Sequence, residues 1–151
     1  MKTVFTFFAV VVLTACTNIN SMSRSCYHDN IRLERELSVC KAVRVGNMLY
    51  VSGIAGSGKT DTAIKEAYGE LRRTLALHGL SFDNVVSERI YTQDLEGFLE
   101  NKAIRAAYYG RIYPVSTWVE VARLQLSEHV IEIEVTAVIP KQFKIINFDS
   151  W

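Results

Sequence analysis

The segment from Gly53 to Thr60 carries residues whose types and spacing could bind phosphate. It reads Gly-Ile-Ala-Gly-Ser-Gly-Lys-Thr and fits the pattern G-x-x-x-x-G-K-[ST], in which backbone N–H groups surround the phosphates of a nucleotide. That chemistry also needs a carboxylate for Mg²⁺, normally an aspartate at the end of an apolar strand. The candidates Asp83 and Asp94 follow Leu-Ser-Phe and Tyr-Thr-Gln, so neither ends such a strand. We interpret the segment as a glycine-rich link between a strand and a helix, and we expect no cofactor.

Side chains that could bind a small molecule recur at alternate positions of two strand-like segments. Ser116, Trp118 and Glu120 fall on one face of the first, and Arg89 and Tyr91 share a face of the second. An acid in an apolar strand must be paired or functional, so Glu120 is a candidate catalytic group. Arg89 either binds a carboxylate or forms a structural salt bridge. Trp118 either packs in the core or forms a platform for a ligand.

The histidines and cysteines do not form a recognisable metal motif. The histidines lie far apart without the spacing of zinc ligands, so we expect no metal site; they are His28, His78 and His129. Cys26, His28 and Asp29 form a small cluster, which we interpret as accidental because it lies in a polar tether. Cys26 and Cys40 either pair in an oxidising compartment or remain free thiols, with Cys40 in a strand core.

The N-terminus has the order of a secretory signal. Lys2 precedes an apolar run from Val4 to Leu13, and small residues follow it up to Cys16. The run is shorter than the roughly 20 residues that span a bilayer as a helix. The stretch Leu-Thr-Ala-Cys resembles the bacterial lipobox, which implies that Cys16 carries the acyl chains of a lipid anchor.

This resemblance predicts a signal peptide over residues 1–15 and a lipoprotein of the bacterial cell envelope. The absence of aspartate after Cys16 resembles outer-membrane sorting, with the protein facing the periplasm. Residues 16–30 are polar and predict a tether, and residues 31–140 are enough for one domain followed by a tail over 141–151.

Charge argues against a nucleic-acid partner. The chain has 151 residues with 17 Lys and Arg against 16 Asp and Glu, which leaves a formal net charge of +1. No Lys/Arg run is long enough to follow a phosphate backbone. We therefore expect a small-molecule ligand and no nucleic acid.

The periodicity of apolar residues predicts an α+β domain in the order ββαβαββ. Gly46 and Asn47 punctuate two strand-like runs as a hairpin loop does, and Thr60 or Asp61 begins a helix that ends before Gly79. The expected strands cover 37–45, 48–55, 85–91, 117–124 and 131–137, and the expected helices cover 60–78 and 95–109.

Five blocks of the sequence together resemble the RidA/YjgF family of reactive-intermediate deaminases. They occur in the family's order and span most of the domain; they are Arg44–Gly53, Val85–Val86, Arg89–Asp94, Trp118–Leu124 and Val130–Glu134. The resemblance implies a chorismate-mutase-like α+β fold whose sheet packs against two helices. It also implies a homotrimer with sites in the clefts between subunits.

The same resemblance implies roles for single residues. Ser52 and Gly53 match the family's Ser-Gly pair at the cleft, Tyr91 matches an aromatic that lines it, and Glu120 matches the glutamate of V-E-V. In deaminating members a glutamate helps to activate water, which hydrolyses a 2-imino or enamine acid to the keto acid and ammonia.

Three positions depart from the deaminating members. Ser116 stands where they carry the arginine that binds the substrate carboxylate, Val39 where they carry tyrosine, and Trp118 where they carry a smaller residue. A serine offers one neutral donor in place of a charged bidentate fork. Two hypotheses stay open: an enamine/imine deaminase, or a non-catalytic ligand-binding or interaction module on the same scaffold.

Overall fold

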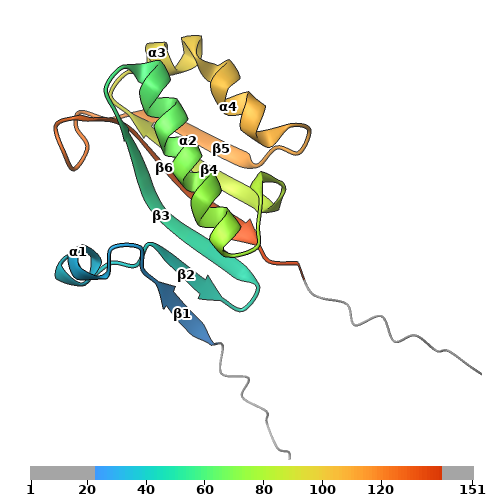
Figure 1. Cartoon of the computed structure of the whole chain (residues 1–151). Helices are drawn as coiled ribbons and strands as arrows, with labels where there is room; N and C mark the ends of the chain where they lie inside the picture. The colour runs from blue at the N-terminus through green and yellow to red at the C-terminus, as the bar shows by residue number, and fades with distance from the viewer. Residues whose placement is uncertain (1–22, 141–151) are drawn as a thin grey trace, which may run out of the picture.

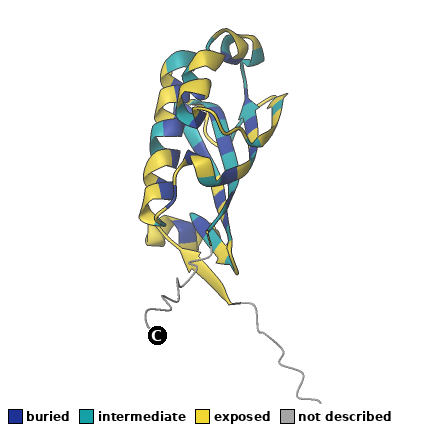
Figure 2. Cartoon of the chain, turned by 90° about the vertical axis from the view of Figure 1, so that its right-hand side faces the viewer, coloured by how far each residue is buried: buried dark blue, intermediate teal, exposed yellow. Residues whose placement is uncertain are grey.

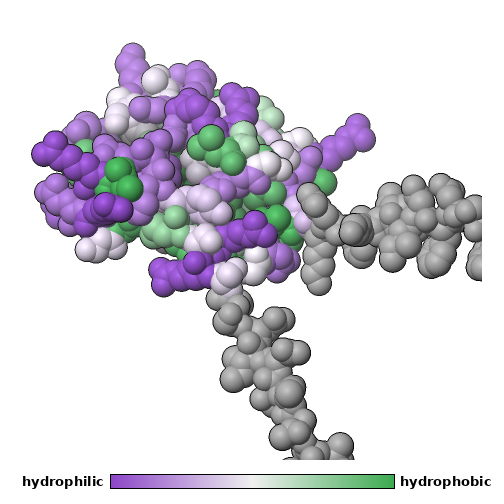
Figure 3. Space-filling view, turned by 60° about the horizontal axis from the view of Figure 1, so that its bottom comes forward, coloured by the Kyte–Doolittle hydropathy of each residue, from purple (hydrophilic) through white to green (hydrophobic). Residues whose placement is uncertain are grey.

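The computed structural model describes residues 23–140. The expected signal peptide, Cys16 and the C-terminal tail over 141–151 lie outside the described residues. None of the helices within 23–140 combines the length and the apolar character needed to cross a bilayer. On the face that Figure 3 brings forward, hydrophilic residues predominate and apolar residues occur in small groups.

The described chain forms one six-stranded sheet in the order β1-β2-β3-β6-β4-β5, with helices covering one face (Figure 1). All neighbouring strands pair antiparallel except β4 and β5, which are parallel. The elements are β1 (Arg24–Tyr27), α1 (Ile31–Glu36), β2 (Ala42–Val45), β3 (Met48–Ser57), α2 (Thr60–Leu77), the 3-10 turn η1 (Phe82–Asn84), β4 (Val85–Thr92), α3 (Leu95–Glu100), α4 (Lys102–Tyr109), β5 (Val115–Glu120) and β6 (His129–Val138).

The core lies between the sheet and α2, where Figure 2 shows the buried residues. β6 alternates strictly: Ile131 and Ile133 are fully buried toward the helices, whereas Glu132 and Glu134 point to the opposite face. From α2, Tyr68, Leu71 and Leu75 are fully buried against this surface. Each such side chain contributes about 1.5–3 kcal/mol by leaving water.

The predicted hairpin and first helix are confirmed. Val45 pairs with Met48 across Gly46 and Asn47, and Gly46 has a φ of 59°, which a glycine adopts without strain. α2 begins at Thr60, within the predicted bounds, but its N-cap is Lys59, which makes no side-chain capping hydrogen bond, so Thr60 and Asp61 lie in the first turn and do not cap the helix.

Three predicted elements differ from the structure. The strand expected over 37–45 is limited to β2, because residues 37–41 form the turn between α1 and the sheet. The helix expected over 95–109 is divided at Asn101 into α3 and α4, and the strand expected over 117–124 is β5, which ends at Glu120.

The tether expected over 16–30 contains a strand. β1 pairs with β2 in the register Cys26 to Val43, so the sheet begins at Arg24. The fold is therefore α+β, as predicted, with one additional strand at its N-terminal edge.

Candidate functional site

The cavity beside Gly53 is lined by polar groups that could hold a small molecule. It has a volume of about 430 Å³, and the residues that line it include Val39, Lys41, Ser52, Gly53, Gln125 and Glu132. A second cavity of about 290 Å³ shares Lys41, Gly53, Gln125 and Glu132 and adds His129. We call these two adjoining cavities the Gly53 cleft.

The main acid of the cleft is Glu132, which sequence reasoning did not select. The pairing of β3 with β6 is irregular between Val51 and Ile54, so Ser52 and Gly53 bulge out of the ladder. A Cβ atom added at Gly53 would lie 1.8 Å from Oε1 of Glu132. The Glu132 carboxylate therefore lies directly against the β3 backbone at Gly53, and a side chain at this position would displace it.

Lys41 brings a positive charge to the same cleft. Its backbone N–H donates to the Tyr27 carbonyl and its carbonyl accepts from the Ser52 N–H, both at 2.9 Å, which fixes its position between β1 and β3. Its Nζ lies 3.7 Å from Oε1 of Glu70, a distance at the outer limit of an ion pair. The ammonium thus retains capacity to bind an anionic ligand.

His129 adds an unsatisfied nitrogen. Within residues 23–140, its Nδ1 is the one buried side-chain nitrogen or oxygen without a hydrogen-bond partner. His129 lines the Gly53 cleft together with Glu132, although this nitrogen is itself buried.

Arg89 and Tyr91 share the Glu132 face of the sheet, but Arg89 lies outside the Gly53 cleft. Nη1 of Arg89 is 2.6 Å from Oε1 of Glu134, in a separate depression of about 210 Å³. The hydrogen bond to Glu134 and that group's charge raise the pKa of the Arg89 guanidinium. Tyr91 stands opposite Glu132 in the pairing of β4 with β6. Of the two alternatives for Arg89, the structure therefore shows the salt bridge.

Ser116, Trp118 and Glu120 share a face, as expected, but it is the face that the helices cover. Ser116 Oγ donates to Oε2 of Glu88 at 2.7 Å, and Trp118 Nε1 donates to Ser116 Oγ at 2.6 Å. The Trp118 ring meets Phe98 of α3 edge-on, with centroids 5.1 Å apart. In a single chain these side chains do not converge on Ser52 and Gly53.

Glu120, expected as the catalytic acid, has a structural partner instead. Its Oε2 accepts a hydrogen bond of 3.0 Å from the backbone N–H of Leu95, which is the first residue of α3. The N-cap of this helix, Asp94, accepts a second one from the Gly97 N–H. The carboxylate satisfies a free N–H at the start of the helix. Side-chain alternation places Glu132, and not Glu120, in the Gly53 cleft.

Sequence reasoning also missed the buried carboxylate of Glu88, which is 1% exposed. It accepts hydrogen bonds of 2.6–2.8 Å from Tyr68, Tyr109, Arg105 and Ser116. Burial, and then the charge of Glu88, raise the pKa of the Tyr68 and Tyr109 hydroxyls, which therefore remain donors. Because the Glu88 carboxylate is fully hydrogen-bonded within the core, we interpret this network as structural.

The phosphate-loop pattern does not form a loop. Most of its residues, Gly53–Ser57, belong to β3, where Ile54 to Ser57 pair with β6. Only Gly58 and Lys59 connect β3 to α2. The segment is thus a strand-to-helix connection, and its backbone N–H groups are not arranged around a phosphate.

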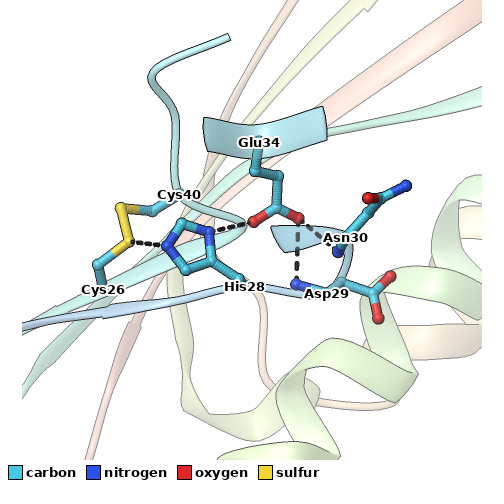
Figure 4. Close-up of a disulfide and its surroundings, with 6 residues drawn as sticks. All are labelled: Cys26, His28, Asp29, Asn30, Glu34 and Cys40. Carbon is cyan, nitrogen blue, oxygen red and sulfur yellow. Dashed lines mark hydrogen bonds and ion pairs between the residues drawn. A yellow bond between two sulfur atoms is a disulfide. The ribbon is translucent and has the colours of Figure 1, made fainter. Parts of the chain in front are cut away.

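At the edge of the Gly53 cleft, Cys26 and Cys40 form a disulfide with Cα atoms 5.6 Å apart, which resolves the two alternatives for these cysteines (Figure 4). His28 Nδ1 lies 2.6 Å from Oε2 of Glu34, and Nε2 lies 3.2 Å from Sγ of Cys26. The interpretation of Cys26 and His28 as an accidental grouping was wrong, because β1 and α1 hold both residues in place.

Comparison with known proteins agrees with this architecture. The family model described as Endoribonuclease L-PSP matches residues 32–139. The RutC family protein YjgH of Escherichia coli is 30% identical over 108 residues, which cover 67% of this chain and 82% of that protein. A RutC family protein of Pyrococcus horikoshii is 28% identical over 106 residues, covering 64% of this chain and 83% of that protein.

Solved structures show the same fold. A YjgF/YER057c/UK114 family member from Mycobacterium tuberculosis matches with a TM-score of 0.71 and 30% identity, covering 78% of this chain and 100% of that chain. A YjgF family protein from Neisseria meningitidis matches with a TM-score of 0.68 and 24% identity, covering 79% of this chain and 97% of that chain. This chain therefore belongs to the Endoribonuclease L-PSP family, which includes the RidA, YjgF and RutC proteins.

Proposed function

We propose that the Gly53 cleft binds a small enamine or imine and hydrolyses it to a carbonyl compound and ammonia. The observation that carries this proposal is the carboxylate of Glu132, which rests against Gly53 in a cavity that Lys41 also lines. A carboxylate that borders a cavity can accept a proton from water as the water attacks. The family's deaminating members support the choice of reaction.

The chemistry follows from the groups present. An enamine first becomes the imine, by gaining a proton at carbon and losing one from nitrogen. Glu132 then removes a proton from water, the hydroxyl oxygen bonds to the imine carbon, and the C=N electron pair moves to nitrogen, which takes the proton from Glu132. The resulting carbinolamine loses ammonia and leaves the carbonyl compound, so one imine and one water give one carbonyl and one ammonia. Lys41 attracts a substrate carboxylate in place of the arginine that is absent at position 116.

The test is ammonia release from freshly generated imines, with and without a carboxylate, by the wild-type chain and two variants. Glu132→Gln keeps the shape but removes the base, and we expect a loss of 10²- to 10⁴-fold in turnover. Glu134→Gln is the matched control, because Glu134 lies two residues along the same face but outside the cleft, and its turnover should stay within about twofold. Equal turnover by Glu132→Gln and wild type would refute this role for Glu132.

A second candidate function is a non-catalytic binding module. It is favoured by Ser116, whose Oγ is bound to Glu88, and by Val39, which lines the cleft in place of a tyrosine. A ligand that raises the melting temperature without turnover, with the rise lost in Glu132→Gln, would support this alternative.

We also propose a homotrimer with intersubunit clefts, as the family resemblance implies. β5 lies at the edge of the sheet, and its exposed apolar side chains Val115 and Val119 face away from the helices. Tyr50, on the uncovered face, is 48% exposed. A neighbouring subunit against this face would cover these groups.

The lipobox-like stretch before Cys16 supports a third proposal, that the domain is exported and lipid-anchored at the cell envelope. The disulfide between Cys26 and Cys40 is consistent with an oxidising compartment. This proposal concerns location only and is independent of the chemistry in the cleft.

A further inference from the structure

Outside the chemistry proposed for the Gly53 cleft, three potential metal ligands meet where β1 and the segment before β2 come together. The sulfurs of Cys26 and Cys40 and a ring nitrogen of His28 all lie within 4.8 Å of one another. Cys26 and His28 are exposed and Cys40 is half-buried, so an ion can reach them from solvent. Figure 4 shows the three side chains side by side, with Glu34 behind the imidazole.

The imidazole is oriented as a ligand. Its Nδ1 lies 2.6 Å from Oε2 of Glu34, and because a carboxylate only accepts, Nδ1 carries the proton of this hydrogen bond. The other ring nitrogen, Nε2, lies 3.2 Å from Sγ of Cys26. With Nδ1 held by Glu34, Nε2 is the ring nitrogen that faces the sulfurs and is placed to bind a metal.

Glu34 is itself fixed. Its Oε1 accepts from the backbone N–H groups of Asp29 and Asn30 at 3.1 and 3.0 Å, and the residue is 9% exposed. A carboxylate that holds the far nitrogen of a histidine is the usual second partner of a zinc-binding imidazole.

We propose that, when the Cys26–Cys40 disulfide is reduced, Cys26, His28 and Cys40 bind a divalent zinc-like cation. A dithiol reductant supplies two electrons and two protons: the S–S bond breaks, two thiols form and the reductant becomes a disulfide. Zn²⁺ then displaces the two thiol protons and bonds to both sulfurs and to Nε2, and water takes the fourth position. The disulfide and the metal exclude each other, so the site responds to redox state.

The distances suit this ion. With Zn–S of about 2.3 Å and Zn–N of about 2.0 Å, a tetrahedral site places its sulfurs about 3.7 Å apart and sulfur and nitrogen about 3.5 Å apart. The Cα separation of 5.6 Å permits this after rotation of the two short side chains. Because Cys40 and Glu34 also line the Gly53 cleft, loading the metal would change one wall of that cleft.

The experiment titrates Co²⁺ and Zn²⁺ into the full chain. The protein is reduced with a water-soluble phosphine, which becomes the phosphine oxide with oxygen from water, and is then desalted without air. We expect one Co²⁺ per reduced chain with thiolate-to-cobalt charge-transfer absorption, and none in the oxidised chain. Cys26→Ser combined with Cys40→Ser should abolish binding. His28→Ala should weaken Zn²⁺ binding by at least tenfold, and Glu34→Gln by about tenfold.

Two matched variants control for unrelated ligands. Cys16→Ser removes the other cysteine, and His78→Gln removes a histidine whose ring packs edge-on against Tyr27, with ring centroids 4.4 Å apart. Both should bind metal like the wild type. Glu132→Gln should also bind metal normally, so failure of the metal site and failure of the cleft chemistry are distinguishable.

Two results would overturn the proposal. One is metal affinity of the reduced wild type no tighter than that of the double-serine variant. The other is absorption without thiolate charge transfer. Hydrogen exchange of Arg24–Tyr27 gives a third test, because it shows whether reduction releases β1 from the sheet. Release of β1 that no metal reverses would also refute the site.

Discussion

Lys41 and Arg89 are two cations near the candidate site, and they differ in what already neutralises them. Lys41 is 3.7 Å from its nearest carboxylate oxygen, whereas Arg89 is 2.6 Å from Glu134. A charge that is already paired has less to offer a ligand, so Lys41 is the stronger candidate to bind a substrate carboxylate.

Lys41→Ala should therefore raise KM for imines that carry a carboxylate by roughly 10- to 100-fold, equivalent to a lost charged hydrogen bond of about 1.5–3 kcal/mol. The expected kcat is little changed. Arg89→Ala is the control and should leave KM within about twofold. Steady-state ammonia release with charged and neutral imines measures KM and kcat for both variants. A larger rise in KM for Arg89→Ala than for Lys41→Ala would show that Arg89 binds the substrate carboxylate.

The resemblance to the RidA/YjgF family located Ser52 and Gly53, whereas it did not locate the acid of the cleft. The structure places both residues at the bulge of β3 and in the cleft. Glu120 and Glu132 both alternate with apolar residues, so their patterns are equivalent. What separates them is the face of the sheet, which depends on strand order and on the parallel register of β5 with β4, and these are set by long-range packing.

At the scale of elements, α2 and β6 were predictable because each buries one regular face. The repeat of Ile64, Tyr68, Leu71 and Leu75 fits one helical stripe, and all four are fully buried. β1 was not predictable, because all of Arg24–Tyr27 is exposed and carries no apolar alternation. Its place depends on pairing with β2 and on the disulfide to Cys40, which tertiary structure determines.

The Glu88 network ties β4 to α2 and α4 and should dominate the response of the core to mutation. Glu88→Gln removes the charge that neutralises Arg105, whose guanidinium also lies over Tyr109. An unpaired buried charge costs about 3–5 kcal/mol, so we expect a loss of that order in the free energy of unfolding. Urea denaturation followed by circular dichroism measures it.

Two comparisons make this expectation specific. Glu134→Gln breaks the solvent-exposed ion pair with Arg89 and should cost less than about 1 kcal/mol. Replacing Glu88 and Arg105 together with methionine should recover part of the loss, since no charge is then left unpaired. Equal stability of Glu88→Gln and Glu134→Gln would show that the network does not stabilise the fold.

At the scale of the whole molecule, the helices cover only one face of the sheet. The other face carries Tyr50, Arg89 and Glu134, all at least partly accessible. In this chain Ser116 and Ser52 lie on opposite faces, so one binding site can include both only if two copies contribute. An intersubunit cleft would resolve that geometry.

Light scattering on a chain that starts at Ser23, and so retains β1, should report three copies at micromolar concentration. Tyr50→Asp places a charge on the uncovered face and should shift the population toward monomer. Leu77→Asp is the control, because Leu77 is 81% exposed at the end of α2 on the other side. A stable wild-type monomer would count against both the trimer and the intersubunit site.

Attachment of the whole chain to a membrane should depend on Cys16. A single acyl chain gives only marginal, reversible binding at about 0.8 kcal/mol per buried CH₂, whereas two or more chains anchor a protein stably. The lipobox-like Leu-Thr-Ala-Cys predicts such a multiple acylation.

Cys16→Ser should therefore abolish labelling with a radioactive fatty acid, and the chain should leave the membrane fraction or keep its signal peptide. Cys40→Ser, which changes another of the three cysteines, should still be labelled and sediment with membranes. A mature wild-type chain that is soluble without detergent would refute the anchor, and it would leave the chemistry of the Gly53 cleft untouched, because that cleft is formed entirely by residues after Asp29.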